Sequence, residues 1–288
     1  MDELSEDNLI RVFDELVEEG VIVYEPHQVI ERDFGGYQVE FRICPSLTKK
    51  PHKVGAKLDP AFNKTEKWGP GSDMYSIDDR LEVARPNNNT HVLTLNLFCV
   101  DRPQLVMLTQ DSYRRQHEPL DIDDFKAVLE IAVPLQNMYF IYNCSEAAGC
   151  SRVHKHLQGL RGPPRAFQQL LQADKSKDKI AVPFQYFIHH FEHRFEDIAA
   201  SDMLAKYESL FEQARNALGL EKGVVCPHNV VLWKGWMIVI PRRKGAHGKA
   251  SANAAGMLGS FWVPDRSLLD AYAVLNPREV LEELGVPW

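Results

Sequence analysis

Two histidines and a glutamine alternate along one short segment of the chain, His154-Lys155-His156-Leu157-Gln158. If this segment is extended, alternate side chains project to the same side, so both imidazoles and the amide would share one face of a strand. A turn-forming stretch, Gly149-Cys150-Ser151, comes directly before it and could point backbone N–H groups at an anion. A nucleophilic imidazole beside phosphate-binding donors is what nucleotidyl transfer through a phosphohistidine requires.

The motif is more specific than a pair of histidines alone. The chain has 11 histidines in 288 residues. From its composition roughly 0.4 His-x-His pairs are expected by chance, but only about 0.02 His-x-His-x-Gln strings. The motif therefore favours catalysis over two alternatives, namely strand histidines bonded within the fold and a pair of metal ligands. Lys155 alternates away from the histidine face, and we interpret it as structural.

Composition and charge limit the classes of function. Of the 288 residues, 44% are hydrophobic and 25% are charged, and the net charge is −7. These values are ordinary for a globular protein that can bury a substantial core. An acidic chain of this kind is not expected to coat a nucleic acid. A small polyphosphate remains a suitable ligand, because it needs only a local basic pocket.

The cysteines and the N-terminus indicate a compartment. The five cysteines form no Cys-x-x-Cys pair and are odd in number, so neither a disulfide framework nor a thiolate zinc site is expected. Reduced thiols fit the cytoplasm or the nucleus. The acidic start, Met1-Asp2-Glu3, does not resemble a signal or transit peptide. No run of about 18 apolar residues is present, so we expect no membrane span.

Periodicity and punctuation predict a mixture of helices and strands. Apolar residues at helical spacing predict helices over 4–19, 123–133, 201–218 and 277–284. Alternation predicts strands over 37–43, 138–142 and 154–160, and hairpins that pair 91–98 with 105–108 and 229–232 with 236–240. Residues 51–90 carry most of the loop signals and are expected to form a long loop region. Hairpins rather than strict β-α alternation favour an α+β fold with an antiparallel sheet, in a single domain over 1–288.

The histidine motif and its surroundings resemble a known family. The motif after Gly149-Cys150-Ser151 is similar to the histidine-triad superfamily, and most of all to its ATP adenylyltransferase branch, the diadenosine tetraphosphate phosphorylases of fungi. Further similar segments follow in the family's order. They are Pro45-Ser46-Leu47-Thr48-Lys49-Lys50-Pro51, His91-Val92-Leu93 through Asn96-Leu97-Phe98, Val182-Pro183-Phe184, Asn229 with Trp236 to Arg242, and Ser251-Ala252-Asn253 through Gly256 and Gly259. The resemblance therefore covers nearly the whole chain.

The resemblance implies both a fold and a reaction. The fold would be a histidine-triad-like antiparallel sheet with flanking helices and extra segments. Members of the family cleave diadenosine tetraphosphate with inorganic phosphate, giving ATP and ADP through an adenylyl-histidine. The implied ligands are a dinucleoside polyphosphate, ATP, ADP and phosphate. A divalent cation such as Mg²⁺ is expected to accompany the polyphosphate, with no tightly bound cofactor and no metal held by the protein itself.

The same resemblance implies roles for individual residues. His156 would be the nucleophile, and His154 and Gln158 would bond and position the phosphates. The substrate-binding residues would be Lys50, Asn143, Ser151 and Arg152. A neutral imidazole, abundant near pH 7, is a good nucleophile. Because the amide of Gln158 cannot titrate but can donate a hydrogen bond, transfer to an anionic acceptor is favoured over hydrolysis.

The chain departs from the family pattern at several cations. Leu97 replaces a usual lysine, Gln104 stands near a position that is often histidine, and residues 261–265 lack a lysine often found there. Arg152 stands where the family is commonly neutral, and it could replace lost positive charge. Two alternatives stay open: a nucleotide-sugar uridylyltransferase, whose family also has His-x-His-x-Gln, and a nucleotide-binding protein with little turnover. Lys155 between the histidines, with the ordered C-terminal segments, favours the adenylyl branch.

Three other groups of residues could contribute chemistry. His189, His190 and His193 lie near Glu192, but a solvated face is favoured over a metal site because no zinc-like spacing is present. The run Arg242-Arg243-Lys244 could hold phosphates or be a solvated loop, and the sequence favours neither. Two tryptophans could stack on adenine, although packing is favoured for both. They are Trp233 and Trp236.

Overall fold

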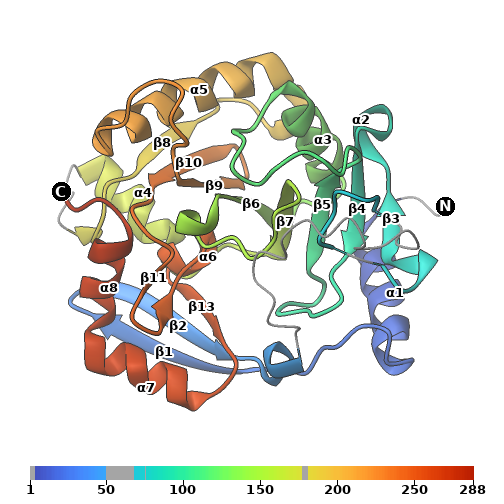
Figure 1. The fold of residues 1–288 in the computed structure, drawn as a ribbon, viewed down its shortest axis with the longest axis horizontal. Helices are drawn as coiled ribbons and strands as arrows, with labels where there is room; N and C mark the ends of the chain where they lie inside the picture. Colours follow the sequence, from blue (N-terminus) through green and yellow to red (C-terminus); the bar gives the residue numbers. More distant parts are fainter. Residues whose placement is uncertain (1–3, 50–67, 75, 177–180) are drawn as a thin grey trace.

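An eight-stranded antiparallel sheet forms the centre of the computed structural model, which describes residues 4–49, 68–74, 76–176 and 181–288 (Figure 1). The strand order is β3-β4-β5-β7-β6-β9-β10-β8, and all neighbours in it are antiparallel. The strands are β3 (Glu82–Ala84), β4 (His91–Leu95), β5 (Leu105–Thr109), β6 (Met138–Cys144), β7 (His156–Arg161), β8 (Phe187–His190), β9 (His228–Trp233) and β10 (Trp236–Pro241). The predicted α+β fold with an antiparallel sheet is confirmed.

A second, three-stranded sheet lies below the first in Figure 1. It pairs β1 (Gln28–Phe34) with β2 (Tyr37–Ile43) in antiparallel fashion, and β13 (Ser260–Val263) runs parallel to β2. Two further short strands, β11 (Ala246–His247) and β12 (Ala250–Ser251), pair with each other. The parallel register places Ser260 opposite Glu40 and Trp262 opposite Arg42, which brings C-terminal side chains beside an N-terminal strand.

Eight α-helices occur in the described residues. They are α1 (Glu6–Glu18), α2 (Pro86–Asn89), α3 (Ile122–Ala132), α4 (Phe167–Ser176), α5 (Ala200–Ala217), α6 (Ala254–Met257), α7 (Arg266–Leu275) and α8 (Pro277–Leu284). Local start signals are present at two helices: Asp121 forms a capping box for α3, and Asn276 caps α8, with Pro277 at its first position. No described helix combines the length and apolar character needed to cross a membrane.

The two faces of the large sheet carry separate hydrophobic clusters, because side chains alternate along every strand. On one face, Phe140, Val230 and Met237 pack with residues of α1, α3 and α5. On the other face, Ile141 and Val231 pack with residues of the three-stranded sheet and of α4, α6, α7 and α8. The second layer leaves part of the sheet face over β4, β5 and β7 for a pocket.

Several details differ from the sequence prediction. The strand predicted over 154–160 begins only at His156, and His154 forms an isolated bridge with Arg115. The described part of the predicted loop region, 68–74 and 76–90, contains the 3-10 turn Asp79–Leu81 together with β3 and α2. Residues 50–67 and 75 lie outside the described residues. The predicted elements did not include β1, β8, β11, β12, β13, α4, α6 and α7. The shortest of them, such as β11 with two residues, carry too little periodicity to be recognised.

Candidate active site

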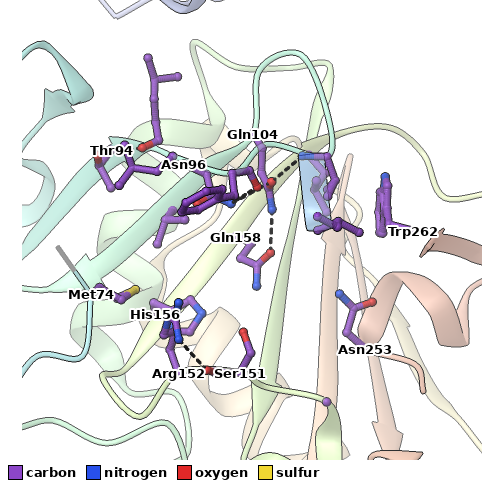
Figure 2. A pocket seen from close by; sticks show the side chains of 18 of the residues that line it. Met74, Thr94, Asn96, Gln104, Ser151, Arg152, His156, Gln158, Asn253 and Trp262 are labelled. Carbon is purple, nitrogen blue, oxygen red and sulfur yellow. Dashed lines mark hydrogen bonds between the residues drawn. The ribbon is translucent and has the colours of Figure 1, made fainter. Parts of the chain in front are cut away.

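The pocket that contains His156 and Gln158 lies on the face of β4, β5 and β7. Antiparallel register aligns His156 with Leu108, and Gln158 with Val106. Directly opposite residues project to the same face of a sheet, so these four side chains share the pocket floor. Figure 2 shows the opposite wall, where Asn253 and Trp262 approach from the C-terminal segment.

The remaining walls differ in polarity. An apolar wall consists of Trp68, Met74 and Leu81, and it adjoins the apolar floor residues Val106 and Leu108. A polar wall comes from Gly149, Ser151 and Arg152, the turn that precedes the histidine motif. A Cβ at Gly149 would lie 2.6 Å from the carbonyl oxygen of Ala252, so only glycine lets this turn approach the C-terminal wall so closely.

Charge in the pocket is one-sided. Arg152 is the only lysine or arginine among the described residues that line it, and none of those residues is an aspartate or glutamate. Among the described residues, an anion entering this pocket therefore meets one guanidinium and no competing carboxylate. Arg152 itself lies against the turn, where its Nη1 donates to the carbonyl oxygen of Ser151 at 3.4 Å. The predicted neighbours Ser151, Arg152, His156 and Gln158 are thus brought together.

His156 is oriented by the backbone. Its Nδ1 lies 2.8 Å from the carbonyl oxygen of His154. A carbonyl oxygen only accepts, so Nδ1 carries a proton, and in the neutral ring the lone pair resides on Nε2. The strand on which it lies is held at this end by Gln116, whose Oε1 accepts from the His156 backbone N–H at 2.8 Å. The tautomer required of a nucleophile that attacks through Nε2 is therefore built into the fold.

The side chain of His154 does not line the pocket. It is fully buried, with Nε2 donating to the carbonyl oxygen of Thr109 at 3.0 Å and Nδ1 2.9 Å from Ser72 Oγ. Burial, together with the nearby His156, lowers the pKa of His154 to about 4. A neutral, fully bonded imidazole at this place supports His156 through the His154 carbonyl group rather than contacting a ligand.

A second buried histidine behaves in the same way, and together they predict acid sensitivity. Burial also lowers the pKa of His228 to about 4. A histidine in the unfolded state titrates near pH 6.5. Below that pH the unfolded state binds a proton that the folded state does not bind, so the unfolding free energy decreases as pH falls. Between pH 7 and pH 5 we expect a loss of about 2 kcal/mol of unfolding free energy for each of the two histidines.

Urea unfolding at several pH values tests this expectation. His228→Gln, which can keep bonds to Tyr207 and to the Cys226 carbonyl group, should reduce the difference between pH 7 and pH 5 by about 2 kcal/mol. Tyr207→Phe provides the control, because it removes a partner but no titrating imidazole. An identical pH dependence in parent and His228→Gln would contradict the role of this histidine.

The remaining predicted residues take different places. Asn143 is buried away from the pocket, where its Oδ1 accepts from Asn229 Nδ2 and from the backbone N–H of Ala254, both at 2.8 Å. It ties β6 to the start of α6 and so helps to place Asn253 in the pocket wall. Lys50 lies outside the described residues, so its predicted contact with phosphate stays a prediction.

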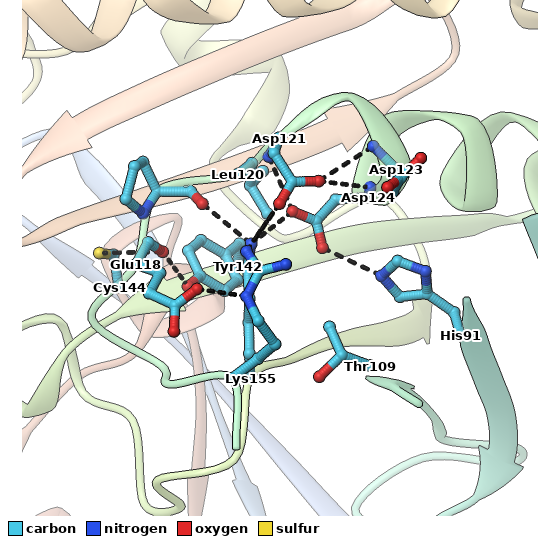
Figure 3. A network of polar contacts seen from close by, with 12 residues as sticks. His91, Thr109, Glu118, Leu120, Asp121, Asp123, Asp124, Tyr142, Cys144 and Lys155 are labelled. Atoms are coloured by element: carbon cyan, nitrogen blue, oxygen red, sulfur yellow. Dashed lines mark hydrogen bonds and ion pairs between the residues drawn. The ribbon is translucent and has the colours of Figure 1, made fainter. Parts of the chain in front are cut away.

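Lys155 is structural, as its alternation predicts. Its side chain is fully buried, and Nζ donates to Asp124 Oδ2 at 2.6 Å and to the carbonyl oxygen of Pro119 at 2.9 Å (Figure 3). The other carboxylate oxygen of Asp124 lies 3.0 Å from His91 Nε2. Lys155 therefore links the histidine segment to the first turn of α3, and this link holds His156 in its position on β7.

Comparisons with known protein families match two consecutive segments of this chain. A family model described as the Ap4A phosphorylase N-terminal domain matches residues 27–171, just over half of the chain, and one described as the ATP adenylyltransferase C-terminal domain matches residues 180–287. The chain belongs to the Ap4A phosphorylase family. Strands β3 to β7 lie in the first matched segment and β8 to β10 in the second, so the two segments of this family member share one sheet.

Two relatives of this Ap4A phosphorylase family member are proteins of Saccharomyces cerevisiae. Diadenosine 5',5'''-P1,P4-tetraphosphate phosphorylase 2 is 24% identical over 245 residues, 74% of this chain and 75% of the relative. Protein APA1 is 28% identical over 204 residues, 62% of this chain and 63% of the relative. Among solved structures, yeast Ap4A phosphorylase Apa2 in complex with Ap4A has a TM-score of 0.74 at 21% identity, covering 99% of both chains. Its complex with AMP has a TM-score of 0.76 at 23% identity, covering 100% of this chain and 98% of that one.

The other candidate residues of this family member make structural contacts. Arg242 is fully buried and donates to Asn229 Oδ1 at 2.6 Å and to the Ala252 carbonyl oxygen at 2.8 Å, which makes it a brace rather than a phosphate ligand. Trp233 packs in the core, as expected. His190 lies against the ring of Trp236. Within the described ranges, no group of three or more His, Cys, Asp or Glu side chains could hold a metal ion.

Sequence reasoning missed several pocket residues of this family member. Trp68, Asn253 and Trp262 line the pocket. Asn253 lies in one of the segments that resemble the family, but the sequence predicts no role for any of the three. Gln104 was noted only as a departure, although it contacts Gln158 directly. A signal for Gln104 existed: it closes the hairpin between β4 and β5 one position before Leu105, opposite the strand that carries Gln158.

Proposed function

We propose that this protein cleaves diadenosine tetraphosphate with inorganic phosphate, giving ATP and ADP. The observation that carries the proposal is the placement of His156 in the pocket. Its Nδ1 proton is held by a backbone carbonyl group, and it lies beside the polar turn of Ser151 and Arg152. Family membership and the relatives named above support the same reaction.

The reaction consists of two displacements at one phosphorus atom. The lone pair on His156 Nε2 attacks the α-phosphorus of one adenosine, and the bond from that phosphorus to the bridging oxygen breaks, which releases ATP. A phosphate oxygen then attacks the adenylyl group, the bond from phosphorus to nitrogen breaks, and ADP forms while the electron pair returns to Nε2. His156 carries positive charge in the intermediate, and its retained Nδ1 proton stays bonded to the His154 carbonyl group, which stabilises that charge.

A divalent cation such as Mg²⁺ is part of this proposal as a companion of the substrate. Carboxylates are the side chains that suit Mg²⁺ in proteins, and none lines the described pocket. The cation would therefore be bound through phosphate oxygens and would supply neutralisation of their charge. The five cysteines are free thiols in the structure, which supports the further proposal that the protein resides in the cytoplasm or the nucleus.

Product analysis separates the proposed function from its alternatives. Diadenosine tetraphosphate is supplied with and without inorganic phosphate, and a uridylyl sugar serves as the control substrate. We expect ATP and ADP in equal amounts, formed only when phosphate is present. Turnover of the uridylyl sugar instead would support a nucleotide-sugar transferase, and binding without turnover of either would support a nucleotide-binding protein. Each of those results would overturn the proposal.

Arg152 gives a prediction for substrate binding. Arg152→Met removes the only lysine or arginine that lines the described pocket while keeping a long side chain. We expect the KM for diadenosine tetraphosphate to rise about tenfold, a loss of about 1.4 kcal/mol of binding, with a smaller change in kcat. Arg152→Lys should restore part of the affinity, because it returns the charge without the bidentate geometry. A KM within twofold of the parent for Arg152→Met would contradict a phosphate-binding role.

Gln158 gives a prediction for the choice of acceptor. Gln158→His replaces an amide that cannot titrate with an imidazole that exchanges protons near neutral pH. We expect hydrolysis of the intermediate to rise relative to phosphorolysis, so that the ratio of AMP to ADP increases. Gln158→Met provides the control, since it lacks both the amide donor and a titrating ring. An unchanged ratio in an active Gln158→His variant would count against the proposed role of the amide.

A further inference from the structure

The orientation of one amide in the pocket is set by the backbone. Val100 N–H donates to Gln104 Oε1 at 3.0 Å. A backbone N–H can only donate, so the oxygen of the Gln104 amide must face it. Asn96 Nδ2 donates to the same oxygen at 2.9 Å and also to the carbonyl oxygen of Phe98 at 3.2 Å. Gln104 is buried, and two independent donors therefore hold its oxygen on one side.

The fixed orientation of the Gln104 amide also determines the orientation of the Gln158 amide. With its oxygen held by Val100 and Asn96, the nitrogen of Gln104 faces Gln158, and Gln104 Nε2 donates to Gln158 Oε1 at 3.0 Å. The NH₂ group of Gln158 is then on the opposite side of its amide. Figure 2 shows that nitrogen directed away from Gln104, toward the part of the pocket that holds His156 and Ser151. Among the described residues, Gln158 Nε2 has no hydrogen-bond acceptor.

We propose that Gln104 is a positioning residue that keeps the Gln158 amide donor toward the substrate phosphates. The inference rests on the proposed function, since it deepens the role of Gln158 in that reaction. The terminal torsion of a free glutamine is broad and roughly two-fold, so the amide could turn around at little cost. In the reversed orientation, Gln158 would present an oxygen to an anion, which removes a hydrogen bond and adds repulsion. The contact from Gln104 prevents that reversal.

The direct test replaces Gln104 by glutamate. In Gln104→Glu, a carboxylate oxygen can still accept from Val100 N–H and Asn96, but no atom can donate to Gln158. The Gln158 nitrogen should then turn toward the introduced carboxylate and its oxygen toward the ligand. We expect kcat for diadenosine tetraphosphate to fall at least thirtyfold and ADP to bind at least tenfold more weakly in calorimetry. The same measurements on Gln104→Met, which neither donates nor accepts, should show a smaller loss of about threefold.

A second background separates orientation from added charge. Each Gln104 variant is also made with Gln158→Met, which removes the amide that Gln104 is proposed to orient. If Gln104 acts through Gln158, both Gln104 substitutions should change kcat and ADP affinity by less than twofold in this background. Losses of equal size in both backgrounds would show direct repulsion or a merely structural role and would overturn the inference. Thermal unfolding of all variants shows whether a loss comes from misfolding. If Gln104→Glu does not fold, the comparison of Gln104→Met between the two backgrounds decides the inference.

The failure of the inference is distinguishable from the failure of the proposed function. A parent protein that does not convert diadenosine tetraphosphate and phosphate to ATP and ADP contradicts the proposed function. The ADP titrations still test the amide orientation in that case, because they need no turnover. A parent that turns over normally, with Gln104 variants whose effects add to those of Gln158→Met, contradicts only the inference.

Discussion

Replacing His156 by alanine is expected to abolish turnover of diadenosine tetraphosphate while the protein stays folded. The variant loses the nitrogen that we propose attacks phosphorus, and no other histidine, lysine or cysteine among the described residues lines the pocket. We expect a decrease of at least about 10⁴-fold in kcat, which corresponds to about 5 kcal/mol of transition-state stabilisation. The measurement is the rate of ADP formation with saturating phosphate. Activity within tenfold of the parent would exclude His156 as the nucleophile.

Nucleotide binding should survive this substitution. The apolar wall and the polar turn of Ser151 and Arg152 do not depend on the imidazole, so calorimetry should detect ATP binding to His156→Ala within about tenfold of the parent, or about 1.4 kcal/mol. His193→Ala is a matched control, since His193 is an exposed histidine away from this pocket. A folded His156→Ala protein that no longer binds ATP would show that His156 is mainly a binding residue.

Lys155→Met is expected to cause the largest loss of stability. The substitution keeps a long side chain but leaves the buried carboxylate of Asp124 without its ammonium partner. Removing one member of a buried ion pair typically costs about 3–5 kcal/mol, because the other charge stays buried and uncompensated. Urea unfolding at pH 7 should therefore show a decrease in unfolding free energy of that size. The Lys155→Met, Asp124→Leu double variant should recover part of the loss, since it removes both charges.

Helix α3, which carries Asp124, offers a matched control for the Lys155→Met prediction. Lys126 pairs with Asp123 at 3.4 Å, and both side chains are about half exposed. Exposed pairs contribute little, so Lys126→Met should change the unfolding free energy by less than about 0.5 kcal/mol. Equal effects of Lys155→Met and Lys126→Met would show that burial of the Lys155 ion pair does not govern its contribution.

Much of the fold could be predicted because its elements are locally marked. The capping residues of α3 and α8 satisfy backbone donors of the helix ends, and such signals lie within a few residues of the element. The hairpin of β9 and β10 turns through Lys234 and Gly235, both with positive φ, as a two-residue hairpin turn requires. Elements such as β13 could not be predicted, because its pairing with β2 joins residues more than 200 positions apart.

The nucleophile candidate, the amide two positions on and the glycine turn before them could all be recognised from local sequence. Alternation along a strand is a local property, and it placed His156 and Gln158 on one face. The surroundings of His154, in contrast, depend on contacts between distant parts of the chain. Ser72 and Thr109 form hydrogen bonds with the His154 ring, and Asp73 accepts from its backbone N–H at 3.1 Å. His154 therefore lies outside β7, and its side chain does not line the pocket. Ser72 and Asp73 lie some 80 positions earlier in the chain, and a hydrogen bond across that separation leaves no trace in local periodicity.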